Sequence, residues 1–111
     1  MTFAEMRLAR PSDAIAIRDM ERACFSDPWP IEAIMQAMDP GFGYRTWVAL
    51  EDDAIVGYVS AGIEMATSPR GSLCLHIANL AVTLECRGQG LGRAMLGNAE
   101  AWGRRLGARF S

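Results

Sequence analysis

The sequence predicts an α/β (α+β) domain with an antiparallel N-terminal half, and three features point to that class. Two segments with apolar residues at helical spacing come first, two strand-like segments joined by a turn follow, and a strand, a glycine-rich loop and a helix come last. The 111 residues, 50% of them hydrophobic, suffice for one domain with its own core. We therefore expect residues 1–111 to form a single domain.

The first half is expected to contain a short strand, two helices and a hairpin. The first strand is followed by Pro11, and Ser12 or Asp13 can cap the helix that comes next. Asp52-Asp53 forms the turn of the hairpin. The expected bounds are 6–10 for the first strand, 13–24 and 31–38 for the helices, and 44–51 and 54–64 for the hairpin strands.

The second half is expected to centre on one covered strand and one long helix. Residues 72–82 are apolar on both faces around Leu80-Ala81-Val82, which favours a central strand covered on both sides. After a loop, 91–106 have helical spacing, Gly107 is a C-cap, and 108–111 begin another strand. The apolar stripe of this helix consists of Leu91, Met95, Ala99, Trp102 and Leu106.

The composition excludes several classes of function. All 11 basic residues are Arg, which excludes catalysis by Lys, and a net charge of −2 does not favour binding to nucleic acid. No run of about 18 apolar residues is present to span a membrane, and the N-terminus lacks the pattern of a signal peptide. Three separated cysteines and one histidine match no metal pattern. We expect a cytoplasmic protein without a metal.

Three glycines, Gly88, Gly90 and Gly92, stand where the last helix begins. Peptide N–H groups at a helix start are unpaired donors, and with the helix dipole they favour an anion such as pyrophosphate. The nucleotide-triphosphate loop needs a Lys, and the dinucleotide fingerprint needs a third glycine where Arg93 stands, so neither pattern fits. A tight turn that packs the helix on the strand explains the same glycines, and both interpretations stay open on spacing alone.

The segment from His76 to Leu96 resembles motif A of the GNAT superfamily, the acetyl-CoA-dependent N-acetyltransferases. Arg87, Gly90 and Gly92 match the family pattern Gln/Arg-x-x-Gly-x-Gly/Ala. The order of the expected elements also agrees with the family. Three further segments resemble the branch that acetylates protein N-termini, the ribosomal-protein-alanine N-acetyltransferases. They are Cys24-Phe25, Pro28-Trp29 and Leu80-Ala81-Val82.

The resemblance implies a GNAT-like acyl-CoA N-acyltransferase fold, a mixed, mostly antiparallel sheet flanked by helices. It also implies that 1–111 is a truncated domain that lacks the last strands and helix. Acetyl-CoA would be the cosubstrate, and no metal would be needed. The implied cofactor-binding residues are Leu80, Ala81, Val82, Arg87, Gly88, Gln89, Gly90, Leu91, Gly92 and Arg93.

The implied reaction is transfer of an acetyl group to an amine, foremost a protein N-terminal α-amine, by direct attack on the thioester. A backbone N–H near Val82 would stabilise the charge that develops on the thioester oxygen. The catalytic residue is unknown, because the family's usual Tyr lies beyond Ser111, and Tyr44 and Tyr58 do not match its position. The alternative is a CoA-binding module, or a fragment with little or no turnover because the C-terminal catalytic segment is absent.

The implied partner is a protein or peptide N-terminus, with a ribosomal protein as one candidate, and neither nucleic acid nor a membrane. Phe25, Pro28 and Trp29 would wall the acceptor slot, although Trp29 equally suits a core position between the first two helices. The strand 72–82 would have a bare edge, through which a homo-oligomer can form.

Three polar residues keep two interpretations each. His76 and Glu64 can carry a proton, but both also suit ordinary positions near strand ends. Asn79 can hold a substrate group or be a satisfied amide within an apolar strand.

Overall fold

A computed structural model describes residues 5–65, 73–83 and 86–110 of the chain. It contains a five-stranded sheet in the order β1-β2-β3-β4-β5. The first four strands pair antiparallel with their neighbours, and β5 pairs parallel with β4. The mixed, mostly antiparallel sheet is therefore confirmed. The strands are β1 (Glu5–Leu8), β2 (Tyr44–Glu51), β3 (Ala54–Met65), β4 (Leu73–Val82) and β5 (Arg109–Phe110).

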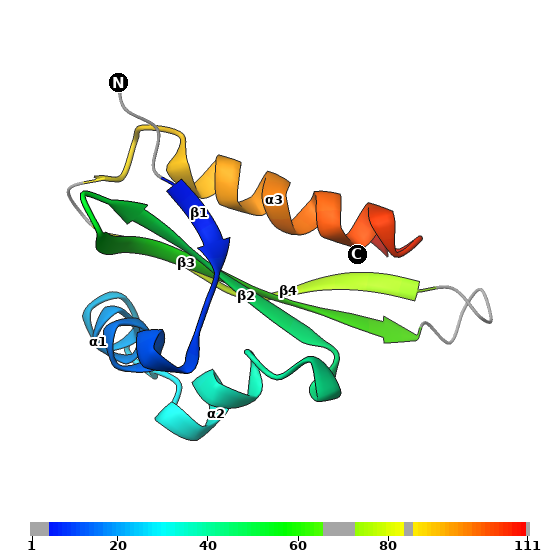
Figure 1. Ribbon diagram of the computed structural model, residues 1–111, viewed down its shortest axis with the longest axis horizontal. Coiled ribbons are helices and arrows are strands. Elements are labelled where there is room, and N and C mark those ends of the chain that lie inside the picture. Colours follow the sequence, from blue (N-terminus) through cyan, green and yellow to red (C-terminus); the bar gives the residue numbers. More distant parts are fainter. Residues whose placement is uncertain (1–4, 66–72, 84–85, 111) are drawn as a thin grey trace.

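Helices cover both faces of the sheet (Figure 1). The helix α3 (Leu91–Arg105) packs on one face against β3 and β4, and α1 (Ala14–Cys24) packs on the opposite face, with α2 (Ile31–Gln36) beside it. Short 3₁₀ turns precede α1 and β2, at Pro11–Asp13 and Pro40–Phe42. Because α1 and α3 lie on opposite faces of β4, the apolar run in this strand is covered on both sides, as predicted.

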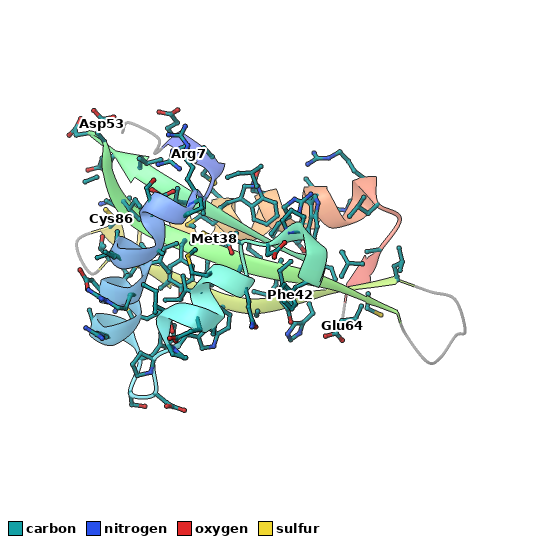
Figure 2. The ribbon with its side chains drawn as sticks, turned by 60° about the horizontal axis from the view of Figure 1, so that its bottom comes forward. Arg7, Met38, Phe42, Asp53, Glu64 and Cys86 are labelled. Carbon is teal, nitrogen blue, oxygen red and sulfur yellow. The ribbon has the colours of Figure 1, made fainter. Side chains whose placement is uncertain are left out.

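The hairpin of β2 and β3 agrees most closely with its prediction. Its turn residues Asp52 and Asp53 both have positive φ, at 52° and 66°, as a two-residue turn between twisted strands requires. Figure 2 shows Asp53 at this end of the sheet and Glu64 at the opposite end. Other bounds shift by one or two residues: β1 ends at Leu8 and α2 ends at Gln36. The loop expected at 66–71 lies outside the described residues.

The core lies on both faces of β2 and β3. Tyr58, Val48 and Val59 are fully buried, and α1 and α2 contribute Ile17 and Ile34 from one side. From the other side α3 contributes Met95, Ala99 and Trp102 of its predicted stripe. The Trp102 ring packs edge-to-face on Trp47 of β2, with ring centres 5.5 Å apart.

The prediction for the end of this stripe is wrong, because Leu106 lies beyond the end of α3 and is 48% exposed. Gly103 takes the inward place instead, where it is buried and a Cβ would lie 3.2 Å from the Leu75 side chain. Gly107 has a φ of 78° and closes the helix as expected, with its N–H donated to the Arg104 carbonyl.

The predicted cap of the first helix also needs correction. Asp13 stands at the N-cap of α1, but its side chain makes no capping hydrogen bond to that helix. It accepts hydrogen bonds from the Arg10 N–H at 2.7 Å and from the Arg7 guanidinium at 2.8 Å. The 3₁₀ turn places Asp13 in helical backbone geometry, which directs the carboxylate back toward β1. The bond from Arg7 lowers the pKa of Asp13 below its ordinary value.

Candidate functional site

Within the residues that the structure describes, one edge of β4 is open over most of its length. The strand β5 pairs with β4 only at Cys74 and Leu75, so within the described part of the chain β4 has no second strand partner from His76 onward. This open edge lies between α1 on one face and α3 on the other (Figure 1).

The peptide groups at the end of β4 alternate between its two edges. Thr83 donates its N–H to the Val56 carbonyl of β3 at 2.8 Å. Since successive peptide groups of a strand point to opposite sides, the N–H groups of Val82 and Leu80 point to the open edge. Ala81 between them pairs toward β3, in register with Tyr58. The open edge therefore presents two backbone donors two residues apart.

Arg87 closes the far end of this edge. Its Nε donates to the Val82 carbonyl at 2.9 Å, and a terminal nitrogen donates to the Sγ of Cys24 at 3.4 Å. The guanidinium thus ties the turn after β4 to the last residue of α1. These bonds orient the start of the glycine-rich loop.

The glycine-rich loop leads directly into α3. Gly88 and Gly90 both have a φ of 81°, a backbone conformation that favours glycine, and a Cβ on either would face open space. Gly90 is the N-cap of α3, and as a glycine it has no side chain that could cap that end. The N–H groups of Leu91, Gly92 and Arg93 form the first turn, which has no intrahelical acceptors. Gln89 and Arg93 are exposed. The arrangement suits an anion, which is one of the two interpretations that the glycine spacing left open.

A β-bulge interrupts the pairing of β3 and β4 beside the open edge. Ser60 pairs with Asn79 and Ala61 with Ile77, so Ala78 is an extra residue on β4. Asn79 is half-buried and donates from Nδ2 to the carboxylate of Glu21 at 2.6 Å. Of its two interpretations, the structure therefore supports a satisfied amide.

Glu21 is a feature that the sequence analysis missed. It is fully buried on the inward face of α1, and it also accepts the Trp29 N–H at 2.8 Å. Burial raises the pKa of the Glu21 carboxyl, and the bond from Trp29 opposes part of that effect. The available signal was its spacing, because Glu21 is four residues after Ile17 and three before Cys24, inside the apolar stripe.

The predicted acceptor wall is the loop between α1 and α2. Phe25, Pro28 and Trp29 are all half-buried, and Phe25 and Trp29 pack against the core. Trp29 also lines a hollow of about 170 Å³ between α2 and the start of β2, together with Ala33, Gln36, Ala37, Phe42 and Tyr44. His76 and Glu64 are exposed side chains that form none of these contacts.

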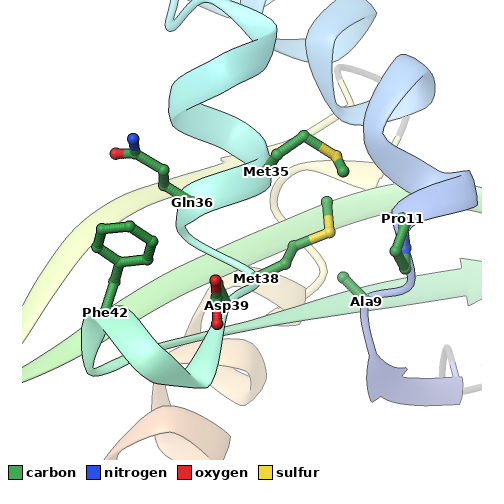
Figure 3. Close-up of a pocket in the computed structure, with 7 residues that line it drawn as sticks. All are labelled: Ala9, Pro11, Met35, Gln36, Met38, Asp39 and Phe42. Carbon is green, nitrogen blue, oxygen red and sulfur yellow. The ribbon is translucent and has the colours of Figure 1, made fainter.

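A second hollow, of about 390 Å³, lies beside the first and shares Gln36 and Phe42 with it. Figure 3 shows its mostly apolar lining, which comes from the end of β1, from α2 and from the turn before β2. The lining residues are Ala9, Pro11, Met35, Gln36, Met38, Asp39 and Phe42. No residue of the open edge or of the glycine-rich loop lines either hollow, so the hollows and the anion site are separate features.

Residues 14–111 match the model of the acetyltransferase (GNAT) family, and the chain belongs to this family. An uncharacterized N-acetyltransferase of Methanocaldococcus jannaschii is 34% identical over an alignment of 90 residues that covers 79% of this chain and 51% of that protein. The chain thus spans about half the length of the curated relative it matches. The family uses acetyl-CoA as its cosubstrate.

Solved structures support the same fold. An acetyltransferase from Trypanosoma brucei aligns with a TM-score of 0.78 at 24% identity, over 96% of this chain and 78% of its own. The glucosamine-6-phosphate N-acetyltransferase of Arabidopsis thaliana aligns with a TM-score of 0.81 at 18% identity, over 99% of this chain and 80% of its own. At these identities the likeness concerns the fold alone.

The described residues also bear on membrane insertion and metal binding. None of their helices has the length and apolar character needed to cross a lipid bilayer. Their His, Cys, Asp and Glu side chains form no group of three or more that could hold a metal ion.

Proposed function

We propose that this chain binds acetyl-CoA along the open edge of β4 and at the start of α3, and transfers the acetyl group to an amine. The observation that carries the proposal is the juxtaposition of the two outward N–H groups of β4 with a helix start whose N-cap is Gly90, the second of two glycines of positive φ. Acetyl-CoA combines an extended arm that contains amides with an anionic pyrophosphate. It therefore needs an open strand edge for the arm and an anion site for the pyrophosphate.

In this proposal the N–H groups of Leu80 and Val82 donate hydrogen bonds to the acetyl and pantetheine arm. Ala81 lies between these two donors in the same strand. Residues 88–93 surround the pyrophosphate, and Arg87 positions their loop. A backbone N–H fixed at the thioester oxygen stabilises the charge that develops there during attack. Holding the amine and the thioester in one geometry supplies much of the remaining rate. No side chain is assigned as the catalytic acid or base.

The proposed acceptor is a protein N-terminal α-amine, and the ribosomal-protein-alanine branch is the proposed subfamily. Phe25, Pro28 and Trp29 support this assignment, because all three are half-buried and Glu21 joins the Trp29 N–H to Asn79 of β4. An α-amine with a pKa of about 7.7–8.0 is partly neutral at physiological pH, so it can attack without a strong base. The free thiols Cys24, Cys74 and Cys86 fit the reducing cytoplasm, which is the proposed location.

A thermal melt with acetyl-CoA tests the cofactor half of the proposal. At 100 times the dissociation constant, acetyl-CoA should stabilise the folded protein by about 2.7 kcal/mol. Replacement of Gly90 by Ala should weaken acetyl-CoA binding by about tenfold or more, because its Cβ would project into the open space of the loop. The matched control is Gly107→Ala, which places the same strain at a φ of 78° far from the loop and should keep its affinity.

Release of free CoA thiol with a peptide that begins with Ala tests the transfer half. Thiol release that needs both the peptide and acetyl-CoA supports acetyl transfer. A melt that shifts without any thiol release would instead support a CoA-binding module. Equal affinities of the Gly90 and Gly107 variants would contradict the assignment of the loop.

A further inference from the structure

Glu21 is an unusual residue for its place in the fold. Its side chain is fully buried on α1, among positions that an amphipathic helix normally fills with apolar residues. Within the described part of the chain it forms no ion pair, since the salt bridges there involve other carboxylates. A buried carboxylate without a cation is costly unless hydrogen bonds compensate it.

The hydrogen bonds of Glu21 reach two different segments. Oε1 accepts the backbone N–H of Trp29 at 2.8 Å, in the loop between α1 and α2. Oε2 accepts Nδ2 of Asn79 at 2.6 Å, in β4 and 58 residues away along the chain. One carboxylate therefore joins the proposed acceptor loop to the proposed cofactor strand.

Asn79 stands at a sensitive point of β4. It directly follows the bulged residue Ala78 and directly precedes Leu80, whose N–H points to the open edge. A side chain fixed at Asn79 also limits rotation of the neighbouring peptide groups. The bond from Asn79 to Glu21 thus holds the bulge and the first outward donor in place.

We propose that Glu21 is a positioning residue that holds the acceptor loop at a fixed distance from the cofactor strand, an inference that rests on the proposed acetyl transfer. Glu21 touches neither reactant. It acts through Trp29 on one side and through Asn79 on the other. Its loss should therefore disturb the acceptor more than acetyl-CoA, which also has the glycine-rich loop to hold it.

Two variants of the full chain separate this role from simple packing. Glu21→Leu keeps the approximate volume and removes both acceptors. Glu21→Gln keeps one carbonyl oxygen for Trp29, and its amide can donate to Asn79 once the Asn79 amide turns over. Asp19→Asn is the matched control, because Asp19 lies on the same helix with an exposed carboxylate. Urea unfolding establishes that each variant folds cooperatively.

Hydrogen exchange at the Trp29 amide tests the bonds without any need for turnover. We expect this amide to exchange about tenfold or more faster in Glu21→Leu than in the natural protein, because an unbonded loop amide is open to water. Glu21→Gln and Asp19→Asn should retain slow exchange. Equal exchange in all four proteins would overturn the proposal.

Transfer kinetics test the consequence of these bonds. Glu21→Leu should raise the acceptor KM by about tenfold or lower kcat by a similar factor, while the KM for acetyl-CoA stays within about twofold. Glu21→Gln should restore the acceptor KM, which a general loss of stability would not do. Acceptor and acetyl-CoA constants that change together, or not at all, would overturn the positioning role.

The two readouts distinguish this inference from the proposed function. Loss of Trp29 protection in Glu21→Leu alone, in a protein that releases no thiol, would support the link between loop and strand and contradict acetyl transfer by this chain. The opposite result would be thiol release by the natural protein together with unchanged Trp29 exchange and acceptor kinetics in Glu21→Leu. It would support acetyl transfer and overturn the role of Glu21.

Discussion

At the scale of single residues, the two buried carboxylates respond to pH in opposite directions. The Arg7 bond lowers the pKa of Asp13, so Asp13 contributes stability that is present above its ordinary value of 3.8 and is lost as the pH falls through the folded value. Burial raises the pKa of Glu21 above 4.5, so its ionised form costs stability at higher pH, and that cost disappears as the pH falls toward 4.5.

The pH dependence of Glu21→Gln follows from this sign. The variant lacks the ionisation, so its free energy of unfolding should rise relative to that of the natural protein as the pH increases from about 4.5 toward 8. Urea unfolding at several pH values measures the difference. Asp19→Asn is the control and should show no such trend. A difference for Glu21→Gln that is constant with pH would show that Glu21 titrates alike in the folded and unfolded chain.

At the scale of secondary-structure elements, the glycines of α3 separate helix propensity from packing. Gly97 is exposed, and a Cβ there would meet no atom within 4 Å outside the helix. A Cβ on Gly103 would lie 3.2 Å from Cδ1 of Leu75, which is tighter than ordinary contact. The same helix therefore offers two glycines with different surroundings but the same intrinsic preference.

Gly97→Ala should raise the free energy of unfolding by about 1 kcal/mol, the usual preference of a helix for Ala over Gly. Gly103→Ala gains the same propensity but must displace Leu75 from its place on β4, so it should be less stable than Gly97→Ala. Urea unfolding of the two variants checks the order. An equal gain at both positions would mean that α3 moves away from the sheet at no measurable cost.

At the scale of the whole molecule, the open edge of β4 has two prospective partners. Outward N–H groups of a sheet edge can pair with another chain as well as with an extended ligand. Because acetyl-CoA and a second copy would use the same donors of Leu80 and Val82, their binding should be mutually exclusive.

Sedimentation velocity with and without acetyl-CoA tests this competition. We expect self-association in the absence of the ligand and a shift toward the monomer when acetyl-CoA is added. Gly90→Ala keeps the edge but should bind the ligand weakly, so it should stay associated at the same acetyl-CoA concentration. A chain that is monomeric under both conditions would contradict pairing through this edge.

Local patterns sufficed for much of the fold and for the outline of the candidate site. The hairpin bounds, the turn at Asp52-Asp53 and the glycines before α3 depend on residues close together in the sequence, whose backbone preferences act within a few positions. The family follows from the same stretch, since Arg87, Gly90 and Gly92 belong to one turn and one helix start.

Contacts between distant segments were decided only when the elements packed. Glu21 and Asn79 are 58 residues apart in the sequence, and a hydrogen bond joins them. This bond depends on the rotation of α1 about its axis and on the bulge in β4, and no short sequence pattern predicts either. Asp13 faces Arg7 instead of its own helix, and Gly103 replaces Leu106 at the sheet, for the same reason. Local preferences set the conformation of each segment, whereas the relative placement of two segments sets which polar groups become buried and must find partners.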